Sequence, residues 1–216
     1  MSALLLKALL AYLLGSIIGS LVIGRMRGVD IRTMGSGNAG ATNALRTQGK
    51  AVGLAVLVID LAKGWIATAI LAPAALPLLG NVPDSLQAWG APVCGIAVML
   101  GHVYPVWFGF RGGKGVATLL GTLFGISGTL VLVFVLAWLA TVILLGFVGL
   151  ASILGAVAVT IASLVGRPSP PLPQLCFAVL AAALIIYTHR ANLARMRAGT
   201  EPRAMRLWLL GSRRPP

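Results

Sequence analysis

The chain has 216 residues, of which 58% are hydrophobic and only 10% are charged, and its mean hydropathy is +0.97. Soluble domains carry about 25% charged residues, so this composition excludes an ordinary soluble domain, and it excludes a disordered chain as well. The net charge of +13 comes from 17 Lys and Arg against 4 Asp and Glu. Because the basic residues cluster between apolar runs, they indicate the cytoplasmic loops of a membrane protein, and we expect no nucleic-acid partner.

A series of apolar runs follows along the sequence, at 3–24, 51–76, 89–108, 116–166 and 174–188. A helix needs about 20 apolar residues to cross a bilayer, and the first run is longer than the core of a signal peptide, so it is predicted to remain as one spanning helix. The run 116–166 carries no charge, and glycines at 125–128 and 146–149 are natural breaks in it. Three short crossings there give seven helices, and a single crossing gives five as the alternative.

The distribution of Lys and Arg predicts the orientation of these helices. The basic segments 25–50, 111–115 and 189–216 are expected in the cytoplasm, whereas the N-terminus and the loop 77–90 are expected outside. The prediction is therefore an all-α polytopic integral membrane protein, with the whole chain 1–216 as one domain and 203–216 as a flexible basic tail. Cys94 and Cys176 lie in apolar stretches, so we expect neither a disulfide nor a metal site.

A glycine-rich segment follows the first apolar run and has the composition of an anion-binding loop. Glycines allow successive backbone amides to point at one spot, and hydroxyl, amide and guanidinium groups add further donors for phosphate. The segment lacks the Gly-Lys-Ser/Thr ending of a nucleotide-binding P-loop, and the alternative is a solvated flexible loop. Its candidate binding residues are Gly35, Ser36, Gly37, Asn38, Gly40, Thr42, Asn43 and Arg46.

A second segment, Gly112-Gly113-Lys114-Gly115, stands immediately before an apolar helix. The free amides of a helix N-terminus and a lysine next to them attract an anion, although the same residues are also typical of a tight turn with an interfacial lysine. His102 lies in or near the preceding span and is either a binding residue or a packing residue.

A third segment begins directly after the last apolar run. His189, Asn192 and Arg195 fall on one side of a helix, which is a suitable face for a polar substrate. The alternative is a basic helix that binds lipid headgroups. Within the second apolar run, Asp60 and Lys63 are three residues apart, so they either neutralise each other or serve a nearby site.

Taken together, these segments resemble the bacterial membrane glycerol-3-phosphate acyltransferases that use acyl phosphate, the PlsY family. Two positions depart from the family pattern: Ile18 stands where proline is usual, and Ala191 stands where glutamate is usual. The matching motifs are Gly28-Val-Asp-Ile-Arg32, Gly35-Ser-Gly-Asn-Ala-Gly-Ala-Thr-Asn43, Asp60-Leu-Ala-Lys-Gly64, Gly101-His-x-x-Pro105, Phe110-Arg-Gly-Gly-Lys-Gly-Val-Ala-Thr118 and His189-Arg-x-Asn-x-x-Arg195-x-x-x-Gly199-x-Glu201.

The resemblance implies seven helices and an enzyme without a cofactor in the bacterial inner membrane. It implies transfer of an acyl group from acyl phosphate to the 1-hydroxyl of sn-glycerol 3-phosphate, with lysophosphatidate and phosphate as products. On this reading the active site lies on the cytoplasmic face, and the partners are these two substrates and the membrane lipids. The oligomeric state stays open.

The expected roles follow from the chemistry of two phosphate-bearing substrates. The first segment, with Ser36 as a catalytic donor, is expected to hold the acyl phosphate, and the second segment to hold the other phosphate. His189 and Asn192 are expected to fix or polarise the glycerol hydroxyls. The proton acceptor is either His189 or a phosphate oxygen of the donor, and we favour the phosphate.

Two other functions fit parts of the pattern. A transporter of organic phosphates would also use broken, glycine-rich segments in a polytopic bundle, but the uncharged run 116–166 offers it no polar lining. A membrane scaffold whose arginine-rich tail binds anionic lipid is the third possibility.

Overall fold

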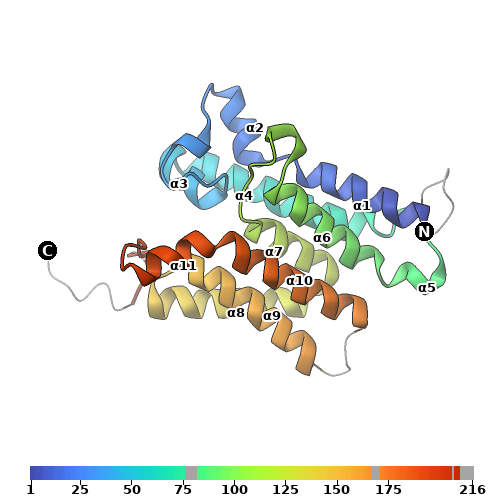
Figure 1. The fold of residues 1–216 in the computed structure, drawn as a ribbon. Helices are drawn as coiled ribbons and strands as arrows, with labels where there is room; N and C mark the ends of the chain where they lie inside the picture. The colour runs from blue at the N-terminus through green and yellow to red at the C-terminus, as the bar shows by residue number, and fades with distance from the viewer. Residues whose placement is uncertain (76–81, 167–170, 206, 210–216) are drawn as a thin grey trace, which may run out of the picture. The chain divides into compact units, whose positions relative to one another are not determined.

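The computed structural model describes residues 1–75, 82–166, 171–205 and 207–209 (Figure 1). Every regular element within these residues is a helix. The chain divides into two compact units, Met1–Ser127 and Gly128–Pro216. The prediction of an all-helical chain is therefore confirmed for the described residues.

The first unit is built on two helix pairs, α1 against α6 and α4 against α7. Small residues permit the close approach: a methyl group on Gly15 of α1 would overlap the carbonyl oxygen of Val98 in α6. The elements of this unit are α1 (Ser2–Gly15), α2 (Gly19–Met26), η1 (Ile31–Thr33), α3 (Ala41–Gln48), α4 (Lys50–Trp65), the π-helical η2 (Ile66–Leu71), α5 (Asp84–Gln87), α6 (Gly90–Val103), η3 (Val106–Phe108) and α7 (Val116–Ile126).

The second unit contains α8 (Gly128–Leu145), α9 (Val148–Val165), α10 (Leu172–Thr188) and α11 (Arg190–Arg197), and α9 packs against both α8 and α10. Part of the predicted basic tail is ordered against this unit, because the guanidinium of Arg203 stacks on the rings of Phe147 and Trp208. The rest of that tail, residues 206 and 210–216, lies outside the described residues, so its predicted flexibility stays a prediction.

The predicted first span is interrupted rather than continuous. α1 and α2 meet at an angle of 45° around residues 16–18, where the sequence predicted a single helix. The reason lies in α4: the ammonium of Lys63 donates to the carbonyl oxygens of Gly15 at 2.9 Å and of Ile17 at 3.0 Å. A buried cation thus satisfies carbonyl groups that a continuous helix would have used internally.

Both glycine breaks predicted in the uncharged run are present, between α7 and α8 and between α8 and α9. Within the described part of the chain, four helical stretches are long and apolar enough to cross a membrane, and two bent helix pairs raise the number to six if each pair is one span. α7, with 11 residues, is shorter than a bilayer-spanning helix, so the count of seven stays a prediction. The four stretches are Lys50–Leu71, Gly90–Phe108, Gly128–Leu145 and Val148–Val165.

Candidate active site

Asn43 organises the first glycine-rich segment from inside. Its side chain is buried, and its amide nitrogen donates to the carbonyl oxygens of Ile31 at 3.2 Å and Met34 at 3.0 Å. Its amide oxygen accepts from the backbone amide of Ser36 at 3.0 Å. These three bonds shape the loop, and the predicted part of Asn43 in substrate binding stays a prediction.

The remaining residues of this segment form a surface around that buried amide. Gly35, Ser36, Gly37, Thr42 and Arg46 are exposed, and Asn38 and Gly40 are half-buried. Gly35 has a φ of +56°, and a methyl group there would overlap the side-chain oxygen of Asn43, so only glycine fits. The first amides of α3 follow directly and have no partner within their own helix. The surface therefore offers amide, hydroxyl and guanidinium donors, as an anion site requires.

The second segment is tied back to the end of α6. The amide of Gly112 donates to the carbonyl of Val103, and the amide of Gly113 donates to the carbonyl of His102, both at 3.1 Å. Gly115, with a φ of +85°, is the N-cap residue immediately before α7. Lys114 is half-buried in this turn. The predicted arrangement of a glycine-rich turn leading into a helix N-terminus is confirmed.

A buried cluster of charged groups lies beneath the second segment. Lys63 contacts Asp60 at 3.0 Å and donates to Nδ1 of His102 at 2.8 Å, and all three side chains are at most 3% exposed. Because an ammonium only donates, Nδ1 accepts, and in a neutral ring the proton is on Nε2. That edge faces Gly113, where a methyl group would overlap Nε2.

This cluster resolves two alternatives that the sequence left open. Asp60 and Lys63 do form a structural pair, and the pair also reaches the candidate site through the ring of His102. His102 lies under the glycine-rich turn, and its predicted part in substrate binding stays a prediction. Oδ2 of Asp60 has no hydrogen-bond partner among the described residues, so this carboxylate is held by one oxygen.

Arg32 joins the two glycine-rich segments, a role that the sequence analysis missed. Its guanidinium binds the carboxylate of Asp30 at 2.8 Å and donates to the carbonyl oxygens of Phe108 at 3.0 Å and Arg111 at 3.1 Å. The hydrogen bond from Arg32 lowers the pKa of Asp30 below its ordinary value. The motif Asp30-Ile-Arg32 was visible in the sequence, but its contacts across the fold were not.

The third segment belongs to the second unit and begins at a bend between two helices. α10 and α11 meet at 52° at His189, which is buried. Nδ1 of His189 lies 2.8 Å from the carbonyl oxygen of Ile185, so this nitrogen donates and a neutral ring has its lone pair on Nε2. The carbonyl thus orients the imidazole.

Asn192 and Arg195 share one partner, which confirms that they lie on one side of α11. The amide nitrogen of Asn192 donates to one oxygen of Glu201 at 2.5 Å, and Nε of Arg195 donates to the other at 2.7 Å. Glu201 is only 6% exposed and is a second residue that the sequence analysis did not rank, although it ends the third motif. Its carboxylate fixes both side chains in place.

The described ranges contain no group of three His, Cys, Asp or Glu side chains that could hold a metal ion. A family model described as glycerol-3-phosphate acyltransferase matches residues 5–199. The chain belongs to this family. It is accordingly an integral membrane acyltransferase. The first two segments and residues 189–199 of the third lie within the matched region.

Individual members of the glycerol-3-phosphate acyltransferase family align over nearly the whole chain. The enzyme of Aquifex aeolicus is 42% identical over 199 residues, which cover 92% of this chain and 98% of that protein. The enzyme of Geotalea daltonii is 44% identical over 191 residues, 88% of this chain and 92% of that protein. The crystal structure of PlsY, an integral membrane glycerol 3-phosphate acyltransferase, in its glycerol 3-phosphate form has a TM-score of 0.82 at 40% identity and covers 94% of this chain and 96% of that one. The lysophosphatidic acid form of PlsY has a TM-score of 0.80.

Proposed function

We propose that this acyltransferase moves an acyl group from acyl phosphate to the 1-hydroxyl of sn-glycerol 3-phosphate and releases lysophosphatidate and phosphate. One structural observation supports these two substrates. Two glycine-rich segments, joined by Arg32, present amides, hydroxyls and cations at one end of the first unit. The carboxylate of that region, Asp30, is paired with Arg32. Such a surface suits phosphate esters and repels no anion.

The first segment is proposed to bind the acyl phosphate. Ser36, Thr42 and Arg46 are exposed around the first amides of α3, where they can donate to the phosphate or to the carbonyl oxygen that becomes negative. Asn43 holds this surface in shape. We assign Lys114 to the phosphate of glycerol 3-phosphate, because a lysine near a helix N-terminus binds a phosphate as a point charge. The amides of Gly112 and Gly113 are bonded to the end of α6 and shape the turn that carries this lysine.

His189, Asn192 and Arg195 of the second unit are proposed to act on the glycerol hydroxyls and the substrate phosphate. The ring of His189 is oriented by the carbonyl of Ile185, so Nε2 is the atom able to accept a hydrogen bond or a proton. Asn192 and Arg195 are positioned by Glu201. These roles rest on the family's chemistry and on the fixed geometry of each side chain.

The proposed reaction is direct transfer without an acyl-enzyme. The glycerol 1-hydroxyl oxygen bonds to the acyl carbon, the bond from that carbon to the phosphate oxygen breaks, and the electron pair leaves with the phosphate. The hydroxyl proton passes to a phosphate oxygen of the donor, with His189 as the alternative acceptor. Holding two reactants together lowers a barrier by about 7–11 kcal/mol, and each oxyanion donor adds roughly 3–4 kcal/mol.

We further propose seven spanning helices in the bacterial inner membrane, with the N-terminus outside and the glycine-rich segments in the cytoplasm. The basic residues support this orientation, because they flank the ends of the helices that carry those segments. The seventh crossing requires α7, which is short, together with both bent helix pairs. Cysteines introduced at Lys50 and Asp84 test the orientation, since only the second should react with an impermeant maleimide added outside sealed cells.

The decisive experiment compares donors with purified protein in detergent. Labelled glycerol 3-phosphate is supplied with acyl phosphate or with acyl-CoA, and only acyl phosphate is expected to give labelled lysophosphatidate. Equal product from acyl-CoA would refute the proposed donor. Uptake of labelled glycerol 3-phosphate into liposomes without acyl transfer would instead identify a transporter. An acyl group trapped on Ser36 would refute direct transfer.

A further inference from the structure

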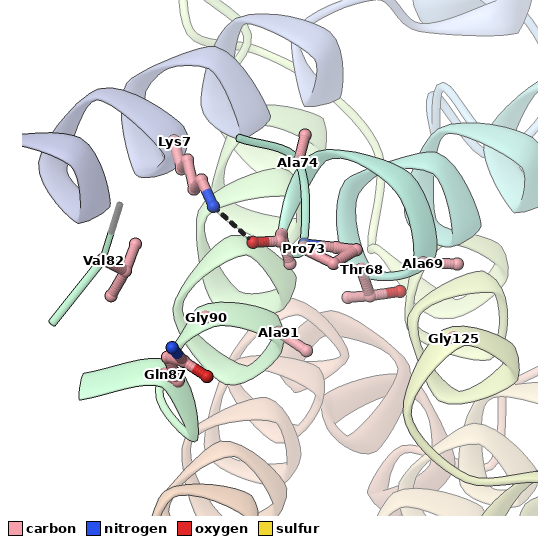
Figure 2. A pocket seen from close by; sticks show the side chains of 11 residues that line it. Lys7, Thr68, Ala69, Pro73, Ala74, Val82, Gln87, Gly90, Ala91 and Gly125 are labelled. Carbon is pink, nitrogen blue, oxygen red and sulfur yellow. Dashed lines mark hydrogen bonds between the residues drawn. The ribbon is translucent and has the colours of Figure 1, made fainter. Parts of the chain in front are cut away.

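A cavity of about 540 Å³ lies in the first unit, between α1, the end of η2 and the start of α6 (Figure 2). This volume is within the range of small-molecule binding pockets, which is about 300–1,000 Å³. Its lining includes Gln87 of α5 and Gly90 at the start of α6, and Figure 1 shows α5 at the end of the first unit opposite α2 and α3. The cavity is thus separate from the two glycine-rich segments of the first unit, the second of which is tied to the opposite end of α6.

The wall of this cavity contains a buried lysine without a carboxylate partner among the described residues. Lys7 is 4% exposed, and its ammonium donates to the carbonyl oxygen of Ala72 at 2.6 Å. No described ion pair includes Lys7, in contrast to Lys63, which is held by Asp60. An ammonium has three hydrogens, and Lys7 has a single acceptor among the residues that the structure describes, which is costly for a buried cation. Burial also excludes the usual arrangement in which a lysine near a helix end extends its ammonium into water.

The opposite wall adds further positive character. Gly90 and Ala91, the first two residues of α6, line the cavity, and the first amides of a helix have no partner inside it. The positive end of the α6 dipole is therefore directed at the same space as the ammonium of Lys7. The side chain of Gln87 also lines the cavity, where its amide donates to Asp84 at 2.7 Å. The remaining lining is largely apolar, with Val82 and several alanines.

We propose that this cavity binds one phosphate group, of the kind carried by an anionic phospholipid headgroup or by a small soluble phosphate ester. The ammonium of Lys7 and the amides at the start of α6 supply the anion contacts. The apolar lining accommodates the glycerol and first methylene groups of a lipid. On the topology proposed above, this end of the first unit faces outward, so the bound phosphate is neither substrate nor product of the acyl transfer.

Binding can be measured by native mass spectrometry and by the thermal stability of the purified full-length protein. The probes are phosphatidylglycerol, the zwitterionic phosphatidylcholine, inorganic phosphate and sn-glycerol 3-phosphate, each titrated separately. We expect phosphatidylglycerol to bind at least tenfold more tightly than phosphatidylcholine. Because inorganic phosphate and sn-glycerol 3-phosphate also bind the proposed active site, only binding that Lys7→Met weakens is counted. Such binding of phosphatidylglycerol alone assigns the site to lipid, and such binding of inorganic phosphate assigns it to soluble phosphate. Binding of neither refutes the proposal.

The variants separate this site from general attraction of lipid to a basic protein. Lys7→Met is expected to lose at least tenfold in affinity for phosphatidylglycerol, and Lys7→Arg to retain it. Lys50→Met removes the same charge at an exposed position and should bind as the wild type does. Wild-type affinity in Lys7→Met, or an equal loss in Lys50→Met, overturns the assignment.

Variants at Gly90 test the same location independently, in case Lys7→Met does not fold. A Cβ atom at Gly90 would meet Ala72 only at 3.6 Å or more, so a side chain at position 90 fits the backbone and occupies the cavity. Gly90→Leu should therefore keep the positive charge but lose phosphatidylglycerol binding, while Gly90→Ala keeps most of it. Unaltered binding in Gly90→Leu contradicts the proposed location. The acyl transfer rate of Lys7→Met should stay at the wild-type level.

Discussion

The buried pair of Asp60 and Lys63 allows a quantitative test of the architecture beneath the candidate site. Their side chains are 1% and 3% exposed, and their charged atoms are 3.0 Å apart. Removing one partner of a buried pair costs about 3–5 kcal/mol, because the other charge is left without compensation. For a protein of this length, 1 kcal/mol corresponds to roughly 2–4 °C in Tm. Asp60→Asn should therefore lower the Tm by roughly 6–20 °C.

Lys63→Met should lower the stability of the protein at least as much as Asp60→Asn does. The same ammonium donates to the carbonyl oxygens of Gly15 and Ile17, so its loss also leaves the break between α1 and α2 unsatisfied. The double variant, by contrast, contains no unpaired buried charge. We expect its Tm to fall by much less than the sum of the two single changes, with a coupling of about 2 kcal/mol or more.

The assay is thermal unfolding of the purified protein in detergent, followed in parallel by acyl transfer at a temperature where every variant is folded. Lys50→Met, an exposed change at the start of α4, should shift stability by no more than about 0.5 kcal/mol. If the stability losses of Asp60→Asn and Lys63→Met sum to that of the double variant within about 0.5 kcal/mol, the two charges do not compensate each other and the reasoning is wrong.

Three further outcomes follow from the site geometry. Gly113→Ala should reduce kcat/KM at least tenfold, because a methyl group there overlaps the buried imidazole of His102. Gly128→Ala is the control and should keep normal kinetics, since no atom lies within 4 Å of the new carbon. Equal kinetics in the two variants would contradict this reasoning. Asn43→Ala should lower both Tm and kcat/KM, since it leaves two carbonyls and an amide without their partner, and a normal Tm would show that the loop does not depend on it. Arg32 lowers the pKa of Asp30, so this carboxylate stabilises the fold above pH ~4 and less as the pH falls through its lowered value. The stability difference between the wild type and Asp30→Asn, measured from pH 6 to pH 3, should therefore shrink on acidification, and a difference that grows would exclude the pairing.

The composition and the spacing of glycines were sufficient to predict the main outlines of the fold. Only helices and closed barrels span a bilayer, and continuous apolar runs of about 20 residues are too long for barrel strands. The glycines at 125–128 and 146–149 do separate helices. The prediction that the first span is one continuous helix was wrong, because the break in it depends on Lys63, which lies 48 residues from Gly15. A local pattern carries no signal for a contact of that range.

In the candidate site, too, local sequence motifs were predictive, whereas contacts between residues far apart in the sequence were not. Motifs identified the segments, and the turn before α7 has the predicted form. The direction of each polar side chain was not predictable: Asn43 points inward to three backbone groups, whereas Ser36 is exposed. Arg32 and Glu201 were missed as organisers, because each acts through partners that only the folded chain brings near.

The ammonium bridge from α4 to the break in the first span also bears on how the chain is made. Residues 15 and 17 are synthesised before Lys63, so their carbonyl oxygens lack this cation until α4 follows. A backbone without outside partners in hydrocarbon satisfies itself best as an unbroken helix. The bend is therefore acquired late in biogenesis, when Lys63 arrives, and an isolated N-terminal fragment should insert as a straight rod.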